Sequence, residues 1–236
     1  MFNDKVFWIS MYNTFYYLVV YNIVMISMAL ILALLLNYPS TKLKRVFRTV
    51  YFLPITFSLV LVAFTFEMVY HKDFGLLNQV LHLIGLNIQF DWLRDINLAL
   101  NALISMRVWR VVGFYMIIIL AGLQSIPQSL YEVAEIDGAN IFQKVIHITI
   151  PLLIPTLLLV IVMSTVWSFQ LFTEPWLLTQ GGPAYATETI ALYTYKNAFL
   201  YSDFGYASAL ATVMALIIIF VSMLQIRFLW QKGGLA

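Results

Sequence analysis

The side chains that most often carry out chemistry are few in this sequence, and they are scattered. Its three histidines, His71, His82 and His147, are not spaced as metal ligands, and cysteine is absent, so we predict no metal site and no disulfide. The chain also lacks a Gly-x-x-x-x-Gly-Lys-Ser/Thr phosphate loop and the Ser-x-x-Lys and Gly-x-Ser-x-Gly nucleophile motifs. We therefore expect no catalytic residues, no bound cofactor and no ATP hydrolysis by this chain itself.

Two arginines lie in an otherwise apolar stretch. Arg107 and Arg110 are both within residues 98–123, at a depth where a charge is costly in a bilayer and normally faces a bundle interior or a water-filled cavity. One or both could contact a substrate, and a guanidinium suits carboxylates and phosphates. Alternatively, the arginines pair with Glu67 or Glu174 for packing, or extend to the outer surface. Both interpretations stay open at this point.

The composition indicates the elements that must position these residues. Hydrophobic residues make up 62% of the chain and charged residues only 10%, whereas soluble domains contain about 45–50% and about 25%. This composition is typical of an integral membrane protein. The net charge of +2 comes from basic residues that are scattered or lie beside apolar segments, so we expect a lipid membrane and no nucleic acid as partner.

Five segments have the length of a transmembrane helix, about 20 apolar residues: residues 14–36, 50–69, 98–123, 151–172 and 206–226. The loop of residues 37–48 contains Lys42, Lys44, Arg45 and Arg48 but no acidic residue, which places it in the cytoplasm. Residues 71–96 and 173–205 are then external loops. We predict an all-α, multi-pass protein of the cell membrane, folded as one transmembrane domain over residues 1–236.

One polar island interrupts the apolar sequence, at residues 130–155. Apolar residues recur in it at spacings of three and four, with one jump of five across Gly138. This pattern predicts two short amphipathic helices outside the bilayer, with a bend at Gly138. We expect the second helix to end at Pro151, where the next span starts. The apolar positions are Leu130, Val133, Ile136, Ile141, Val145 and Ile148.

The island resembles the coupling loop of ABC-importer permeases, here at about residues 124–150. The resemblance is carried by Glu132-x-Ala134-x-x-Asp137-Gly138, followed after nine residues by Ile148-x-Ile150-Pro151. The chain departs from the family at Val133, where alanine is usual, and at Ile150, where leucine is usual. The resemblance implies that this loop sits in a groove of a cytoplasmic ATPase. The implied coupling residues are Glu132, Ala134, Asp137, Gly138, Ile148 and Pro151.

The same resemblance implies an assembly. A second, homologous permease would enclose the pathway with this chain, a dimer of cytoplasmic ABC ATPases would bind ATP and Mg, and an extracytoplasmic solute-binding protein would deliver the substrate. The family usually has at least six spans, and the resemblance begins near Asn13 and Thr14. The chain is therefore expected to lack the family's first helix, either because Met1 is not the natural start or because this is a shortened member.

A second motif resembles the carbohydrate branch of the family, specifically the maltose-type first permease. It starts at Trp176 and includes Gly181, Gly182 and Pro183, which form a tight turn. In that branch the third and fourth spans line the sugar pathway, which implies the candidates Arg107, Arg110, Trp167, Ser168, Leu171 and Thr173. The alternatives are a permease for amino acids, polyamines or sugar phosphates, and an intramembrane enzyme that uses Glu67, His71 and the two arginines.

Overall fold

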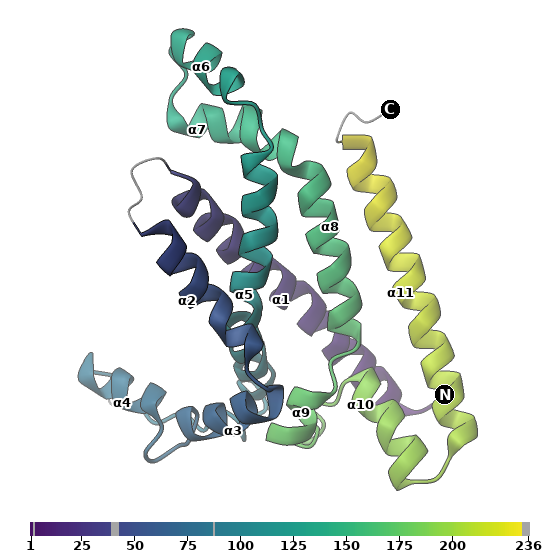
Figure 1. The fold of residues 1–236 in the computed structure, drawn as a ribbon. Coiled ribbons are helices and arrows are strands. Elements are labelled where there is room, and N and C mark those ends of the chain that lie inside the picture. Colours follow the sequence, from purple (N-terminus) through teal and green to yellow (C-terminus); the bar gives the residue numbers. More distant parts are fainter. Residues whose placement is uncertain (2, 39–42, 87, 233–236) are drawn as a thin grey trace. The chain divides into compact units, whose positions relative to one another are not determined.

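The computed structural model describes residues 1, 3–38, 43–86 and 88–232. Lys42, one of the basic residues of the predicted cytoplasmic loop, lies outside the described residues. Within these ranges every regular element is a helix (Figure 1), which confirms the predicted all-α fold. The elements in chain order are α1 (Lys5–Asn37), α2 (Lys44–Thr56), α3 (Leu59–Val69), α4 (Leu76–Leu83), α5 (Ala99–Gln124), α6 (Gln128–Ile136), α7 (Ile141–Lys144), the π-helical η1 (Val145–Thr149), α8 (Ile150–Phe169), α9 (Thr173–Leu178), α10 (Ile190–Tyr195), the π-helical η2 (Lys196–Leu200) and α11 (Phe204–Lys232).

The predicted spans correspond to the long helices. Four of the described segments are long and apolar enough to cross a membrane: α1, α5, the stretch Ile141–Leu178 that contains α8, and Phe204–Arg227 of α11. The second predicted span differs, because it is divided into α2 and α3, which pass the same test only together and are sharply bent at their break. Pro54 lies inside α2, and the break follows Thr56.

The chain divides into two compact units. The first contains residues 1–21, 56–110 and 166–218, and the second contains residues 22–55, 111–165 and 219–236. Helices α1, α5, α8 and α11 each contribute residues to both units. The arginines and the Gly-Gly-Pro turn belong to the first unit, whereas the polar island belongs to the second.

In the first unit, α1 begins earlier than the sequence suggested. Phe7 and Met11 are buried and pack with Ile190 and Leu210 in one apolar cluster. Because these residues continue the helical apolar spacing towards the N-terminus, the helix extends back to Lys5. The segments predicted as external loops also contain helices, namely α4 in residues 71–96 and α9, α10 and η2 in residues 173–205.

The start of α1 is held by a polar cluster in the same unit. Asp4 accepts hydrogen bonds from the hydroxyls of Tyr193 and Tyr206, at 2.6 and 2.7 Å, and from the backbone N–H of Val6 at 2.9 Å. Burial opposes the ionisation of Asp4, but these hydrogen bonds outweigh it, so its pKa lies below its ordinary value.

In the second unit, small residues and polar contacts hold the helices together. A Cβ on Gly113 would lie 1.8 Å from the carbonyl oxygen of Tyr51, and a Cβ on Gly122 would lie 2.4 Å from Oγ1 of Thr156. Glycine therefore lets α5 approach α2 and α8 closely, as small residues do in membrane bundles. In addition, Nε2 of Gln225 on α11 donates a hydrogen bond to Oγ1 of Thr165 on α8, at 2.8 Å.

Candidate functional sites

The predicted coupling loop, residues 124–150, folds into a helical hairpin with the predicted bend at Gly138 (Figure 1). Gly138 has a φ of +75°, which is in the left-handed region. The N–H of Gly138 donates to the carbonyl of Glu135 at 3.0 Å, and the N–H of Ala139 donates to that of Ala134 at 2.8 Å. This pair of bonds is the Schellman motif, which satisfies the last carbonyls of α6. A Cβ on Gly138 would meet nothing within 4 Å, so only its backbone conformation requires glycine.

The second arm of the hairpin begins at Asn140 and continues into the next span. The Oδ1 atom of Asn140 accepts from the N–H of Gln143 at 2.9 Å, and Oε1 of Gln143 accepts from the N–H of Asn140 at 2.8 Å. This capping box fixes the start of α7. The expectation that the helix ends at Pro151 is wrong, because α7, η1 and α8 follow one another without a gap. The π-helical turn η1 ends at Thr149, two residues before Pro151. A proline has no backbone N–H, so Pro151 cannot donate the hydrogen bond of a regular α-helix, and the wider turn accommodates it.

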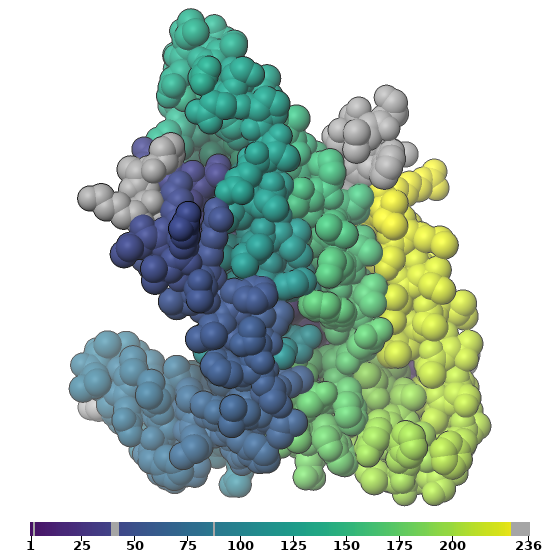
Figure 2. Space-filling view, in the orientation of Figure 1, coloured from purple at the N-terminus to yellow at the C-terminus, as the bar shows by residue number. Residues whose placement is uncertain are grey.

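The hairpin exposes apolar side chains that the described part of the chain leaves uncovered. Ile136 is 86% exposed and Phe142 is 79% exposed. Figure 2 shows the side chains of α6 and α7 gathered in one lobe. Exposed apolar area of this kind marks an interaction surface rather than a protein interior. The other exposed apolar residues of the hairpin are Leu130, Val133, Ile141 and Ile146.

The predicted coupling residues are distributed over this surface. Glu132 and Pro151 are exposed on the two arms. The other four residues, Ala134, Asp137, Gly138 and Ile148, line a hollow of about 300 Å³ inside the bend. Across the two arms, Nζ of Lys144 lies 2.8 Å from Oε1 of Glu135, and the hydroxyl of Tyr131 lies 2.9 Å from that of Thr149. These two contacts therefore hold the two arms of the hairpin together.

The arginines of α5 have different partners. Nη1 of Arg107 lies 2.5 Å from Oε1 of Glu174, whose side chain is buried, whereas the side chain of Arg107 is 15% exposed. This is the packing pair that the sequence left open as an alternative to substrate contact. Arg110 is half-buried, and its Nη2 donates to the carbonyl of Phe57 at 3.3 Å. Trp109, which lies between them in the sequence, is 45% exposed and packs on another aromatic ring.

The remaining pathway candidates differ in exposure. Ser168 is 1% exposed and Leu171 is 3% exposed, so a ligand does not reach these side chains in this conformation. The carbonyl of Leu171 is in turn held by the hydroxyl of Thr189, at 2.6 Å. Trp167 and Thr173 are half-buried. Among the six candidates, Arg110, Trp167 and Thr173 therefore stay more open to a ligand than Ser168 and Leu171.

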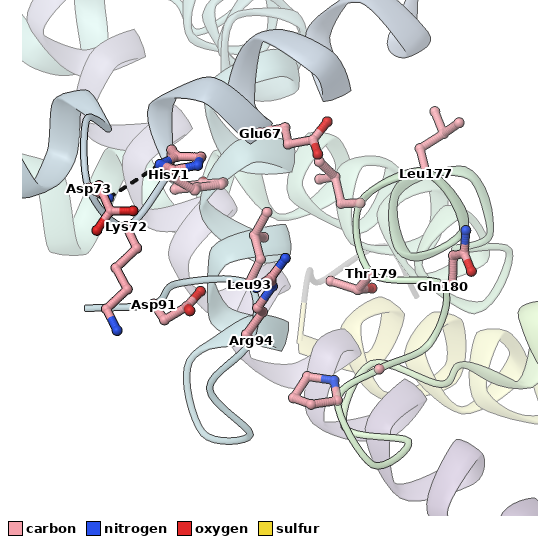
Figure 3. Close-up of a pocket in the computed structure, with 14 residues that line it drawn as sticks. Glu67, His71, Lys72, Asp73, Asp91, Leu93, Arg94, Leu177, Thr179 and Gln180 are labelled. Atoms are coloured by element: carbon pink, nitrogen blue, oxygen red, sulfur yellow. Dashed lines mark hydrogen bonds between the residues drawn. The ribbon is translucent and has the colours of Figure 1, made fainter. Parts of the chain in front are cut away.

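Sequence reasoning missed a polar recess in the first unit, with a volume of about 520 Å³ (Figure 3). Three separate segments line it: the end of α3 with the residues after it, residues 91–94, and residues 177–183. Charged side chains of both signs face it, including Glu67, Asp91 and Arg94. These charges are spread over the sequence between residues 67 and 94, so no local pattern indicates that they meet. Gly182 and Pro183 of the predicted turn form part of its wall.

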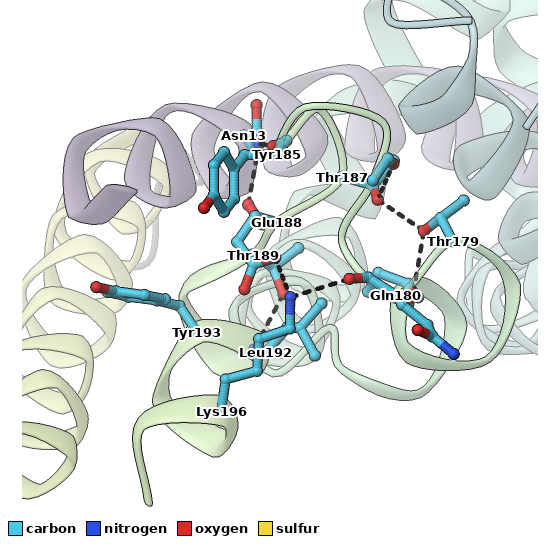
Figure 4. A network of polar contacts seen from close by, with 12 residues as sticks. Asn13, Thr179, Gln180, Tyr185, Thr187, Glu188, Thr189, Leu192, Tyr193 and Lys196 are labelled. Atoms are coloured by element: carbon cyan, nitrogen blue, oxygen red, sulfur yellow. Dashed lines mark hydrogen bonds and ion pairs between the residues drawn. The ribbon is translucent and has the colours of Figure 1, made fainter. Parts of the chain in front are cut away.

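A network of buried polar contacts holds this wall in place (Figure 4). The hydroxyl of Thr187 donates to the carbonyl of Gly182 at 2.7 Å and lies 2.6 Å from that of Thr179. Asn13 of α1 donates through Nδ2 to the carbonyls of Tyr185 and Glu188, at 2.8 and 2.9 Å. The turn is thereby tied to a helix far away in the sequence.

An ion pair with a fully buried carboxylate lies beside the turn. Nζ of Lys196 lies 2.6 Å from Oε2 of Glu188 and donates to the carbonyl of Gln180 at 2.9 Å. Burial raises the pKa of Glu188, although the hydrogen bond and charge of Lys196 act in the opposite direction. A Cβ on Gly181, whose φ is +87°, would lie 1.8 Å from the same Oε2 atom. Glycine is therefore required at this position of the turn.

Comparison with known proteins finds relatives that match nearly the whole chain. Residues 10–232 match the family described as binding-protein-dependent transport system inner membrane component. The chain is 37% identical over 230 residues to the probable ABC transporter permease protein YurN of Bacillus subtilis, covering 97% of this chain and 79% of that protein. It is 39% identical to the lactose transport system permease protein LacF of Rhizobium radiobacter, covering 95% and 76%. The fold resembles a chain in the crystal structure of a bacterial ABC transporter that imports the acidic polysaccharide alginate, with a TM-score of 0.87, 25% identity and coverage of 98% and 81%.

Proposed function

Since the chain belongs to the family of binding-protein-dependent transport system inner membrane components, we propose specific roles in transport for its exposed hairpin and its polar recess. The chain is a multi-pass permease subunit of a sugar ABC importer, and it is not itself an enzyme. It works in a system that depends on a binding protein. The hairpin serves the cytoplasmic side of that system, and the recess serves its external side.

The hairpin of residues 124–150 docks in a groove of a cytoplasmic ATPase. The exposed apolar side chains of the hairpin carry this proposal, above all Ile136 and Phe142. They are flanked by the exposed carboxylates Glu132 and Asp137, which can form polar contacts at the rim of an interface. Two copies of the ATPase would bind ATP and Mg, and a second, homologous permease would place its own loop beside the other copy.

The hydrogen bonds at the bend make the hairpin rigid enough to transmit force. When the two ATPases close on ATP, the groove moves and carries the hairpin with it. The Schellman motif and the capping box keep the two arms in one geometry, so a displacement of α6 is passed to α7 and then to α8 rather than absorbed by the bend. The spans then open the pathway outwards to receive the sugar, and ATP hydrolysis returns them to the inward-open state.

The polar recess of the first unit receives part of the binding protein. It is lined by segments predicted to be external, and side chains of both signs face it. Mixed charges of this kind favour one docking register over others. The substrate is a sugar, as the names of the relatives indicate for lactose and alginate, and Arg110, Trp167 and Thr173 are the candidates that would contact it.

The hairpin assignment can be tested with paired alanine variants. Phe142→Ala removes an apolar side chain that is 79% exposed on the hairpin, and Leu200→Ala removes one that is 54% exposed at the end of η2, in a predicted external segment. The permease, its partner permease and the ATPase are co-expressed and purified through a tag on this chain. We expect Phe142→Ala to lose most of the bound ATPase and of the sugar uptake in proteoliposomes, and Leu200→Ala to lose neither. Full ATPase recovery and uptake with Phe142→Ala would rule out the hairpin as the docking site.

A further inference from the structure

Helix α4 presents an apolar stripe away from the protein. Leu76, Val80, Leu83 and Ile84 are between 44% and 85% exposed. At 100° per residue these four positions fall on one side of the helix. The opposite side faces the protein, because Asn78 on that side is buried. Next to it, Leu77 packs against a cluster around Val62 and Tyr70. Within the described residues, one side of the helix is therefore covered and the apolar stripe is left exposed.

The rotation of α4 is fixed by one buried side chain. Asn78 is 2% exposed, and its Nδ2 donates to the carbonyls of Lys72 and Phe90, each at 2.8 Å. Its Oδ1 accepts from Nε1 of Trp92 at 3.0 Å. A buried amide with these partners is costly to move. The helix consequently cannot roll to bury the apolar stripe against the protein.

The position of α4 along the chain places it beside the end of a membrane segment. Gly75, the residue before α4, donates its N–H to the carbonyl of His71 at 2.9 Å. A Cβ on Gly75 would lie 2.7 Å from the carbonyl oxygen of Val69, the last residue of α3. Figure 1 draws α4 next to α3 in the same unit. Helix α4 thus follows directly on the end of α3, on which Phe64 and Met68 are also exposed.

We propose that α4 lies in the interface of the bilayer, with the stripe of Leu76, Val80, Leu83 and Ile84 among the lipid chains and the other side on the protein. The occupant is lipid rather than another protein because the stripe has no charge or hydrogen-bonding side chain and belongs to a helix that packs through Leu77 on a membrane segment. Amphipathic helices of this kind bury one face at the boundary between headgroups and acyl chains. The polar residues Gln79 and His82 lie on the flank between the stripe and the covered side.

The proposal is tested with spin labels, since the chain has no cysteine of its own. Leu83→Cys and His82→Cys, one on the stripe and one on the polar flank, are labelled with a nitroxide in the full importer complex. The complex is reconstituted in phosphatidylcholine and phosphatidylglycerol vesicles. Collision rates are measured with oxygen, which partitions into lipid, and with a water-soluble nickel chelate. We expect a several-fold higher ratio of oxygen to nickel collisions at position 83 than at position 82.

Two results would overturn it. Equal nickel access at the two positions would place the stripe in water. Protection of position 83 from both reagents would mean that a protein, such as the second permease, covers the stripe. Each variant is first checked for an unchanged elution volume and for sugar uptake. If Leu83→Cys fails these checks, Val80→Cys replaces it, because Val80 is 44% exposed on the same stripe.

Discussion

The bend of the hairpin allows a test in which backbone strain and side-chain contact have opposite effects. Gly138 has a φ of +75° and open space where a Cβ would be. Gly138→Ala therefore adds an atom that collides with nothing outside its own backbone and changes only the conformational preference. Gly138→Asn adds a larger side chain, but asparagine adopts the left-handed region more readily than alanine. We therefore expect the larger side chain, asparagine, to be less harmful at this position than the smaller one, alanine.

The expected magnitude follows from the backbone. An L-residue other than asparagine or aspartate in the left-handed conformation costs about 1–2 kcal/mol, which is a factor of roughly 5–30 in a population. The hairpin has little stability to offset this cost. Within the described residues, neither α6 nor α7 contains a buried residue, and an exposed ion pair such as Lys144 with Glu135 contributes about 0–1 kcal/mol. Gly138→Ala should therefore open the bend in a large fraction of molecules.

The assay is sugar uptake per ATP hydrolysed, in proteoliposomes that contain the complete importer and its binding protein. We expect Gly138→Ala to lower this ratio by several-fold and Gly138→Asn to lower it much less. Gly138→Asp, which places a second carboxylate beside Asp137 on the docking surface, should separate ATP hydrolysis from uptake while the chain stays in the membrane. If Gly138→Asn proved more harmful than Gly138→Ala, the side chain rather than the backbone would matter, and the strain argument would be refuted.

Two further predictions concern the first unit. Arg107→Met leaves the carboxylate of Glu174 buried without its partner, so we expect a loss of about 3–5 kcal/mol. The double variant with Glu174→Gln should lose less than Arg107→Met alone in thermal unfolding, and simple additivity of the two changes would contradict the pairing. Asp4, whose pKa is lowered, contributes stability that is fully present above the ordinary value of 3.8 and is lost as the pH falls through the lowered pKa of the folded state. The Tm difference between wild type and Asp4→Asn should accordingly be constant near neutral pH and shrink below pH 3.8, and a difference that grows in acid would contradict it.

Features with local causes could be predicted from the sequence. Spans follow from hydropathy over about 20 residues, and the hairpin follows from helical spacing on the two sides of Gly138. The bend itself needs only one glycine and the hydrogen bonds of the two preceding turns. These determinants lie within a few residues of the structure that they specify, so the positions of the long helices and of the hairpin are predicted from one sequence.

Features with distant causes could not be predicted in this way. The partner of Arg107 lies 67 positions away, and sequence reasoning offered Glu67 and Glu174 without a reason to choose. Asn13 holds the carbonyl of Glu188 across 175 positions. The recess depends on such contacts, because its wall is fixed from α1. Helices α9 and α10 have six residues each, too few for a periodic pattern to stand out from a loop.

Pro151 has a local effect on the helix, but its outcome could not be predicted from the sequence. A proline cannot donate the hydrogen bond of an interior helix position, which favours a helix end before it. The structure accommodates it with a wide turn, in which the N–H of Ile150 donates to the carbonyl of Val145. The helix therefore runs on from Ile141 through the residues of α8 in the second unit. A helical end at the proline would have placed a hinge between the hairpin and the span, whereas the continuous helix lets a displacement of the hairpin reach the span without one.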